Sequence, residues 1–164
     1  MQGFQGFSVL FPDNSNISIS LYERLGELPH FNSELDNDNV PEPVRNWRAR
    51  LQECDGVLIC TPEYAHGVPG VLKNALDWSV SSGEFMDKPT AVISASPSPD
   101  GGDKANASLV QTLRVMMAKI VKGATLLIPA VSTKLNDKGE ITDIAITQAL
   151  KSLLNVVSDV INKH

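Results

Sequence analysis

The fold is decided by residues 56–78, which read GVLICT, then PEYAHGVPG, then VLKNALDW. The first six residues are apolar and partly β-branched, which predicts a short buried strand. The last eight residues predict a helix, and the nine between them form a Pro/Gly-rich loop. A strand, a loop and a helix make half of a βαβ unit, and ligands of open α/β sheets bind at loops that leave the carboxyl ends of strands. The loop is therefore the first place to expect a site.

The composition of this loop favours a ligand site, although an ordinary connection stiffened by prolines is the alternative. Pro62 ends the strand because it has no N–H to donate, and Pro69 suits the first helical position. The backbone N–H groups near Glu63 and Tyr64 would then be free to face a ligand, and Tyr64 offers a flat amphipathic ring.

A second loop is expected on the same edge of the sheet. Residues 89–95 (PTAVISA) predict another buried strand, and residues 96–102 (SPSPDGG) follow it. The adjacent Gly101 and Gly102 would let the backbone approach a planar ligand, and the serines supply hydroxyl groups. Spacing alone would make this segment a flexible turn.

The chain resembles the NADPH-dependent FMN reductase family of flavodoxin-like flavoproteins, which includes quinone, azo-dye and chromate reductases. The family motif is a strand, Pro-Glu-Tyr-Asn, a short gap and Pro-Gly-x-Leu-Lys-Asn-Ala-x-Asp-Trp. The matching residues are Pro62, Glu63, Tyr64, Pro69, Gly70, Leu72, Lys73, Asn74, Ala75, Asp77 and Trp78. In the second loop they are Ser94, Ser96, Pro97, Gly101 and Gly102. The family's usual Asn is replaced by Ala65, which removes any side-chain contact from that position.

The resemblance implies a single α/β domain over residues 1–164, with a flavodoxin-like doubly wound parallel sheet in three α/β/α layers. It implies FMN as cofactor, NADPH or NADH as electron donor, and a flavin, quinone or azo compound as acceptor. The implied cofactor-binding residues are Pro62, Glu63, Tyr64, Ala65, Ser94, Ser96, Pro97, Gly101 and Gly102. It also implies a homodimer or homotetramer.

The class of reaction follows from the cofactor, because the flavin accepts the hydride and the protein supplies orientation and electrostatics. We therefore expect no dedicated catalytic side chain. Glu63 is expected to be structural and His66 to be a solvated loop residue.

The N-terminal residues differ from the family pattern. Residues 7–11 and 17–21 carry β-formers around a turn-rich segment, which alone predicts a hairpin. The resemblance instead makes residues 17–22 the second strand of the sheet. The family's phosphate-binding loop of Ser, Arg and Asn residues has no counterpart in residues 1–6. Three explanations for the missing inner strand stay open. The coding sequence could start elsewhere, residues 7–11 could take the place of the strand, or another subunit could supply it.

The remaining elements are read from periodicity and capping signals. Helices are predicted over residues 41–53, from an Asp103 N-cap as far as Ile120, and over residues 143–163. A last, edge strand is predicted over residues 124–131 because Pro129 interrupts it. Trp47 is expected in the core, whereas Trp78 is expected in the core or at a subunit contact.

Composition bounds the remaining possibilities. The 164 residues are 42% apolar and carry a net charge of −5, which argues against a nucleic-acid partner. No apolar run long enough to span a bilayer and no signal peptide are evident, so we expect a cytoplasmic protein without a membrane partner. Two cysteines make no disulfide framework. Asp36 and Asp38 lack the spacing of a calcium loop, and no metal is expected.

A second functional reading stays open. Without the phosphate-binding loop, two or three charge-assisted hydrogen bonds are lost, or roughly 4–6 kcal/mol and at least about a thousandfold in FMN affinity. The chain would then be a truncated flavodoxin-like protein that keeps the fold and the oligomer surface but binds FMN weakly or not at all.

Overall fold

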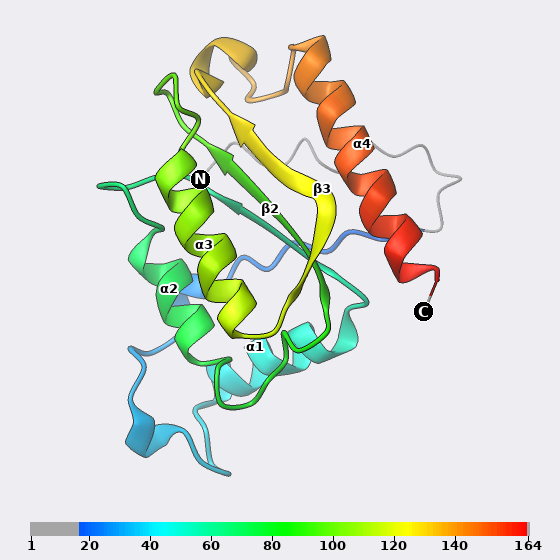
Figure 1. The fold of residues 1–164 in the computed structure, drawn as a ribbon. Helices are drawn as coiled ribbons and strands as arrows, with labels where there is room; N and C mark the ends of the chain where they lie inside the picture. The colour runs from blue at the N-terminus through cyan, green and yellow to red at the C-terminus, as the bar shows by residue number, and fades with distance from the viewer. Residues whose placement is uncertain (1–16, 164) are drawn as a thin grey trace.

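A computed structural model describes residues 17–163 and contains a parallel sheet of three strands in the order β1-β2-β3 (Figure 1). These strands are β1 (Val57–Thr61), β2 (Pro89–Ala95) and β3 (Lys119–Ile128). Every residue of the central strand β2 is buried, because strands pair with both of its edges and helices cover both faces. The predicted parallel sheet is confirmed.

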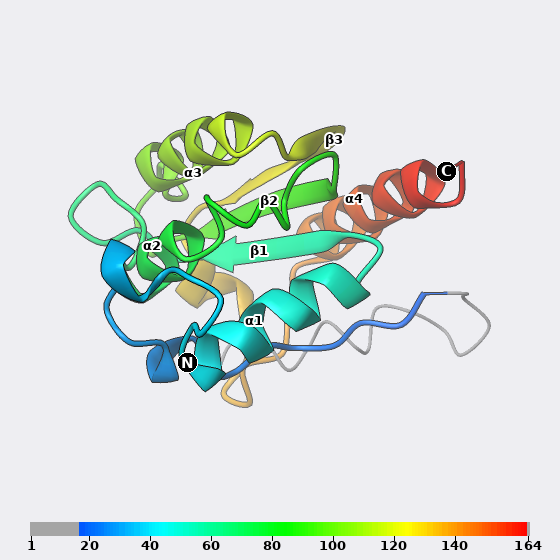
Figure 2. The ribbon, with the colours of Figure 1, turned by 90° about the horizontal axis from the view of Figure 1, so that it is seen from below.

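The helices form two layers on either side of the sheet (Figure 2). One face is covered by α1 (Glu42–Glu53), α2 (Gly70–Asp77) and α3 (Asp103–Val115), and the other by α4 (Ile144–Ile161). The core on the α1–α3 side includes Val44, Trp47, Leu51, Leu72, Leu76, Trp78, Val92, Leu109 and Leu113. The core on the α4 side includes Ala91, Ile93, Val121, Ala124, Ile128, Ile146, Leu150, Leu153 and Leu154. The three-layer α/β/α arrangement is thus confirmed.

Both tryptophans belong to the core on the α1–α3 side. Trp78 was expected either in the core or at a subunit contact, and it is fully buried in the core. Its indole N–H donates to Pro29 O at 2.8 Å. The Trp47 indole N–H donates to Ser79 Oγ at 2.8 Å. Phe31 packs edge-on against Trp78 with ring centroids 5.0 Å apart. Buried indoles with satisfied N–H groups stabilise this face without a polar penalty.

Asn74 of α2 binds the backbone of the segment that precedes α1. Its Oδ1 accepts from Phe31 N at 2.8 Å, and its Nδ2 donates to Pro29 O at 2.9 Å. Asn74 and Trp78 therefore hold the same carbonyl, one turn apart on α2. The Lys-Asn-Ala-x-Asp-Trp part of the sequence motif is thus architectural in this chain.

The strand expected over residues 17–22 is not formed. This segment is extended but unpaired, and Ile19 and Leu21 are exposed. Packing holds its end instead, because the Tyr22 ring lies 4.9 Å from the Trp47 ring. Residues 7–11, the other half of the expected hairpin, lie outside the described residues. Among residues 17–163, no strand pairs with the outer edge of β1.

The boundary between α3 and β3 differs from the prediction. The helix ends at Val115, Met117 is exposed with a φ of 60°, and Ile120 belongs to β3. β3 begins before Gly123, whose φ of 84° accompanies a register shift against β2, and it ends before Pro129. The glycine marks a bulge inside the strand rather than its start. The predicted edge position of this strand is confirmed.

The helix starts follow the expected signals with shifts of one residue. Pro69 and Gly102 are the N-caps of α2 and α3, instead of Pro69 at the first helical position and Asp103 at the cap. Asp143 caps α4, where its Oδ1 accepts from Ile146 N at 3.0 Å. Short 3-10 turns occur at Leu25–Glu27 (η2), Ser33–Leu35 (η3) and Val131–Lys134 (η4).

The helix α4 is long and apolar enough to cross a membrane by length and composition alone, which the sequence reading did not anticipate. Its buried residues Ile146, Leu150, Leu153 and Leu154 pack on the sheet. One face of α4 thus packs on the sheet.

Candidate functional site at the carboxyl edge of the sheet

Three loops leave the carboxyl ends of the parallel strands. They are residues 62–69 after β1, residues 96–102 after β2 and residues 129–134 after β3. We call them the first, second and third loops. Parallel strands end at one edge, so the two loops singled out in the sequence are neighbours, as expected.

The first loop contains a tight turn that presents Tyr64. Tyr64 N donates to Gly67 O at 2.9 Å, and Gly67 N donates to Tyr64 O at 3.0 Å. Ala65 and His66 between them have φ values of 50° and 61°, as in a type I′ turn. The Tyr64 N–H is therefore not free for a ligand, contrary to the prediction. Its side chain is 65% exposed and available.

Glu63 joins the first loop to the start of α3. Its Oε2 accepts from Ala105 N at 2.9 Å, so the carboxylate satisfies one of the unpaired N–H groups of the first helical turn. The His66 side chain is 83% exposed, and its Nδ1 lies 3.5 Å from Glu63 Oε1. A structural Glu63 and a solvated His66 agree with the expectations.

The second loop is held by a buried polar network. The Ser94 hydroxyl donates to Gly101 O at 2.9 Å and accepts from Asn106 Nδ2 at 3.2 Å. Asn106 Nδ2 also lies 3.5 Å from Leu126 O on β3. Ser94 is completely buried and Asn106 is 5% exposed. The Ser94 hydroxyl proton is thus used inside the protein rather than offered to a ligand.

Gly101 and Gly102 are required by both conformation and space. Their φ values are 64° and 78°, which L side chains rarely adopt. A Cβ on Gly101 would lie 3.0 Å from Pro129 N, and one on Gly102 would lie 3.3 Å from the Cβ atoms of Glu63 and Ser94. The pair therefore lets all three loops approach one another.

The third loop supports the second. Ser96 N donates to Ile128 O at 3.1 Å, Val131 N donates to Ser96 O at 3.0 Å, and Ala130 N donates to Ser98 O at 3.0 Å. Ser96 Oγ accepts from Ser98 N at 3.2 Å. These bonds continue the β2–β3 pairing beyond the strands and fix the serine-proline segment.

The nine predicted site residues all lie at this edge but differ in exposure. Tyr64, Ala65 and Pro97 are exposed, Pro62 and Glu63 are partly buried, and Ser94, Ser96, Gly101 and Gly102 are buried. The side chains of the exposed members can contact a ligand directly, whereas the buried side chains of Ser94 and Ser96 shape the loop backbone.

Sequence reasoning missed Asn106 and the third loop. Asn106 follows Gly102 by four positions and lies on the stripe of Leu109 and Leu113, three and seven positions further on. A polar residue on an otherwise apolar helix stripe was the available signal, because buried amides need partners. The third loop carried no such signal.

Other polar groups give no competing site in the described part of the chain. Asp36 is paired with Arg48 at 2.7 Å, and the hydroxyl of Ser81 and then Arg48 lower the pKa of Asp36. Burial raises the pKa of the Cys60 thiol to about 12, and burial also raises that of Cys54. Neither cysteine has the low pKa of a reactive thiol. Among residues 17–163, no group of three or more His, Cys, Asp or Glu residues is placed to hold a metal.

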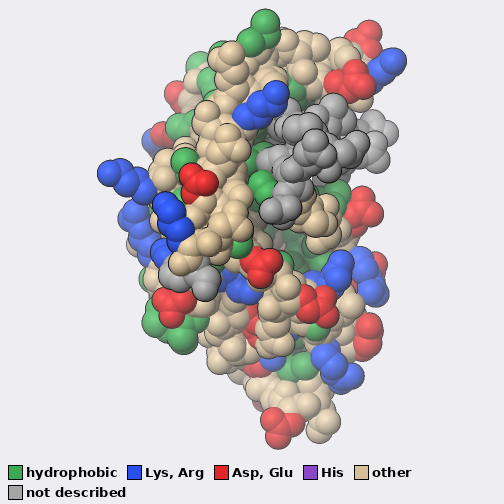
Figure 3. Space-filling model, turned by 90° about the vertical axis from the view of Figure 1, so that its right-hand side faces the viewer, with side chains coloured by type: hydrophobic (Ala, Val, Ile, Leu, Met, Phe, Trp, Pro, Cys, Tyr) green, Lys and Arg blue, Asp and Glu red, His purple; other side chains and the backbone are tan. Residues whose placement is uncertain are grey.

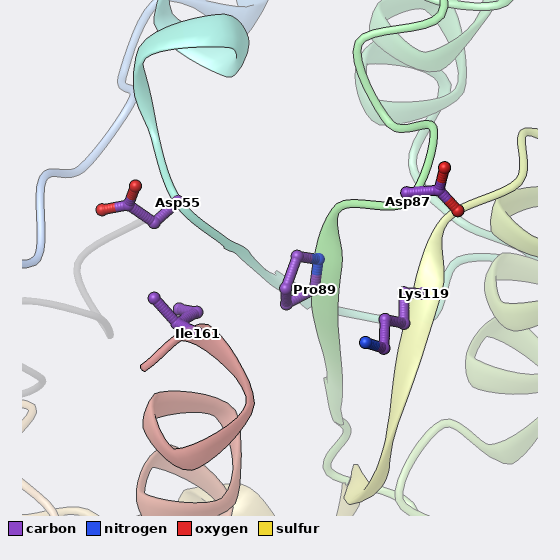
Figure 4. A pocket seen from close by; sticks show the side chains of 5 residues that line it. All are labelled: Asp55, Asp87, Pro89, Lys119 and Ile161. Carbon is purple, nitrogen blue, oxygen red and sulfur yellow. The ribbon is translucent and has the colours of Figure 1, made fainter. Parts of the chain in front are cut away.

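A second concave region lies at the opposite, amino edge of the sheet. It is lined by Asp55, Asp87, Pro89, Lys119 and Ile161 (Figure 4). Asp55 and Ile161 lie on one side of Pro89, with Asp87 and Lys119 on the other, so the two carboxylates do not converge. The face in Figure 3 carries interspersed acidic and basic side chains rather than a field of one sign.

Comparison with known proteins identifies the family. The model for NADPH-dependent FMN reductases matches residues 11–133. The NADH:(hydroxy)cinnamate reductase subunit CrdA of Vibrio ruber is 36% identical over 128 residues, which are 76% of this chain and 62% of the relative. A quinone reductase of Pseudomonas putida is 31% identical over 132 residues, 79% of this chain and 70% of that protein.

A solved structure agrees with these relatives. The flavoenzyme NAD(P)H:(acceptor) oxidoreductase FerB of Paracoccus denitrificans matches with a TM-score of 0.68 and 31% identity, over 85% of this chain and 78% of FerB. The chain thus spans about two thirds of the length of these curated relatives. The fold is that of the flavodoxin-like reductases, and the chain belongs to the NADPH-dependent FMN reductase family, which uses FMN and NAD(P)H.

Proposed function

We propose that this chain is an FMN-dependent oxidoreductase that takes hydride from NADPH or NADH and passes electrons to a flavin, quinone or azo acceptor. The observation that carries the proposal is the junction of the first loop with the start of α3, which directly follows the second loop. Glu63 bonds to Ala105 N at 2.9 Å, and Tyr64 remains 65% exposed beside it. A rigid carboxyl-edge surface with an exposed aromatic ring suits a planar ligand.

The residues present fit the ring of FMN. Tyr64 and Pro97 supply exposed flat surfaces, and Pro62 is partly exposed. Gly101 and Gly102 let the second loop pack closely against Pro129, Glu63 and Ser94, which fixes the backbone at this edge. For the phosphate, the loops of residues 62–69 and 96–102 offer no cationic side chain. The fit is therefore to the isoalloxazine.

The mechanism assigns positioning, rather than proton transfer, to the side chains of this chain. FMN, when bound, supplies the hydride-accepting and electron-donating chemistry. The two loops would orient the ring, and Tyr64 would exclude water from one of its borders. Ser96, Ser98 and Gly101 use their N–H groups inside the protein, so the remaining N–H groups of the second loop, including that of Gly102, would stabilise negative charge on the ring. The Ser94 network keeps the loop rigid.

The acceptor and the assembly are part of the proposal. The relatives are named for quinone and (hydroxy)cinnamate reduction and for an unspecified acceptor, which supports a small organic acceptor. We expect a homodimer or homotetramer on the resemblance given above, and a cytoplasmic location on the sequence features given with the composition. The exposed Phe31 and Val71 near α2 are available for a subunit contact.

A second candidate is a flavodoxin-like protein with little or no FMN affinity. It is favoured by the extended, unpaired residues 17–22 and by the outer edge of β1, which no strand pairs within residues 17–163. In this reading the ring-facing loops persist, but the remaining contacts are too few for tight binding.

The deciding experiment compares FMN with riboflavin. The purified protein is examined for bound flavin by its visible spectrum, and each flavin is titrated with fluorescence quenching as the readout. NADPH oxidation is then followed with benzoquinone as acceptor. An FMN dissociation constant of about a micromolar or less, together with turnover, supports the reductase; no quenching at several hundred micromolar overturns it.

The riboflavin arm separates ring contacts from phosphate contacts. Equal affinities for both flavins would assign binding to the described loops alone. An FMN affinity at least about a hundredfold higher would require a phosphate contact worth roughly 2.7 kcal/mol. That contact would have to come from outside the first and second loops.

A further inference from the structure

The second loop contains a backbone donor without an acceptor. Gly102 is buried, and none of residues 17–163 accepts a hydrogen bond from its N–H. Backbone donors in buried positions are nearly always paired, because an unpaired one costs free energy. A donor of this kind at the ligand edge of an α/β sheet indicates an acceptor that residues 17–163 do not supply, such as a bound ligand.

The direction of this N–H is fixed by the preceding carbonyl. In a trans peptide the C=O of Gly101 and the N–H of Gly102 point in opposite directions. The Gly101 carbonyl is drawn inward by the Ser94 hydroxyl, which donates to it at 2.9 Å. The Gly102 N–H must then point away from Ser94. Glycine at both positions makes this peptide easy to rotate unless it is bonded.

Asn106 determines where the Ser94 proton goes. Its Nδ2 donates to Ser94 Oγ at 3.2 Å, so the hydroxyl oxygen acts as acceptor toward Asn106 and directs its single proton to Gly101 O. Asn106 itself is anchored by Leu126 O on β3 at 3.5 Å and by its backbone N–H to Gly102 O at 3.0 Å. The network therefore has one consistent donor order, from Asn106 to Ser94 to Gly101.

We propose that Ser94 and Asn106 are positioning residues that hold the Gly101–Gly102 peptide with the Gly102 N–H directed at an acceptor atom of the flavin ring. The inference rests on the proposed function for the identity of the ligand. It assigns Ser94 a role behind the loop rather than in contact with the flavin. It also adds Asn106 to the residues on which flavin binding depends.

The test uses Ser94→Ala, with Thr90→Val as matched control. Thr90 lies on the same strand, is equally buried, and donates its hydroxyl to Lys88 O at 3.0 Å at the far end of β2. Both substitutions remove one buried hydroxyl, so a general loss of stability affects both. FMN affinity and the reduction potential of bound FMN are measured for each.

We expect Ser94→Ala to weaken FMN binding about tenfold, which corresponds to roughly 1.4 kcal/mol. The potential should become more negative, because the reduced, negatively charged ring loses a donor. Asn106→Ala should lose less FMN affinity, because the Ser94–Gly101 bond survives in it. This variant replaces Ser94→Ala in the test if Ser94→Ala does not fold. Thr90→Val should match the wild type. Equal losses in Ser94→Ala and Thr90→Val, or none in Ser94→Ala, would overturn the inference.

A second readout needs no flavin. Residues 101–102 are the only Gly-Gly pair in the sequence, so a protein labelled with ¹³C-carbonyl, ¹⁵N-glycine gives one carbonyl-coupled amide signal, that of Gly102. Ser94→Ala should shift this signal and accelerate its hydrogen exchange, and Thr90→Val should not. An unchanged signal in Ser94→Ala overturns the positioning role. Absence of FMN binding by the wild type would instead overturn the proposed function, and the amide measurement would still decide the role of the pair.

Discussion

The first and second loops leave the same edge of the sheet but present different groups to it. The first loop exposes side chains, and its turn bonds only to itself through Tyr64 and Gly67. The second loop also exposes Pro97, Pro99 and Asp100, but it is bonded to its surroundings, by Ser94 beneath it and by the third loop beside it. Both loops can therefore supply surface for a ligand, and the comparison indicates that the second loop also supplies an oriented backbone.

The largest effect is expected where the second loop has no space. Gly101→Ala would place a Cβ 3.0 Å from Pro129 N at a φ of 64°, so we expect a loss of roughly 2–4 kcal/mol in the free energy of unfolding. Urea denaturation measures it. Gly26→Ala is the control, because nothing lies within 4 Å of its Cβ position. A Gly101→Ala protein as stable as Gly26→Ala would contradict the tight packing of this loop.

The contrast between local signals and contacts made by distant segments explains how much of the fold could be predicted from the sequence. Strong local signals identified α2, β2 and the two loops, because apolar runs and Pro/Gly breaks are local properties. The strand that the family resemblance placed at residues 17–22 was wrongly predicted, since neither a resemblance nor the alternation of residues 17–21 can supply a pairing partner. The start of β3 was missed because Gly123 forms a bulge.

The candidate site shows the same limit. The site residues were found as a set, but the division between exposed Tyr64 and buried Ser94 depends on contacts between distant segments. Asn106 reaches Ser94 only after α3 has packed on β2. Hydrogen-bond direction in such a network is a tertiary property.

The side-chain role of the first loop is tested by Tyr64→Ala. Losing an exposed aromatic surface should weaken FMN binding about tenfold, or roughly 1–1.5 kcal/mol, with little change in stability because the ring is 65% exposed. Tyr64→Phe keeps the ring and should bind like the wild type. Fluorescence titration measures both. If Tyr64→Ala binds FMN normally, the first loop does not border the flavin.

The junction between the loops is tested by Glu63→Ala. It leaves Ala105 N without its acceptor at the start of α3, which should cost about 1 kcal/mol of unfolding free energy. Glu63→Gln retains an oxygen acceptor and should lose less. Thermal and urea unfolding of the two variants give the comparison. Equal stabilities of Glu63→Ala and the wild type would mean that the two loops are positioned independently.

The smallest effect concerns the turn of the first loop, where Ala65 has a φ of 50°. Asparagine tolerates this left-handed conformation better than alanine, so Ala65→Asn should stabilise the protein by about 0.5–1 kcal/mol. The control is the same substitution at Ala107, which is exposed within α3, where asparagine should cost roughly 0.5 kcal/mol. Urea denaturation of the pair should therefore give changes of opposite sign. Two losses would show that the turn does not hold Ala65 in the left-handed region, and the exposed loop would then owe its shape to its prolines rather than to the Tyr64–Gly67 bonds.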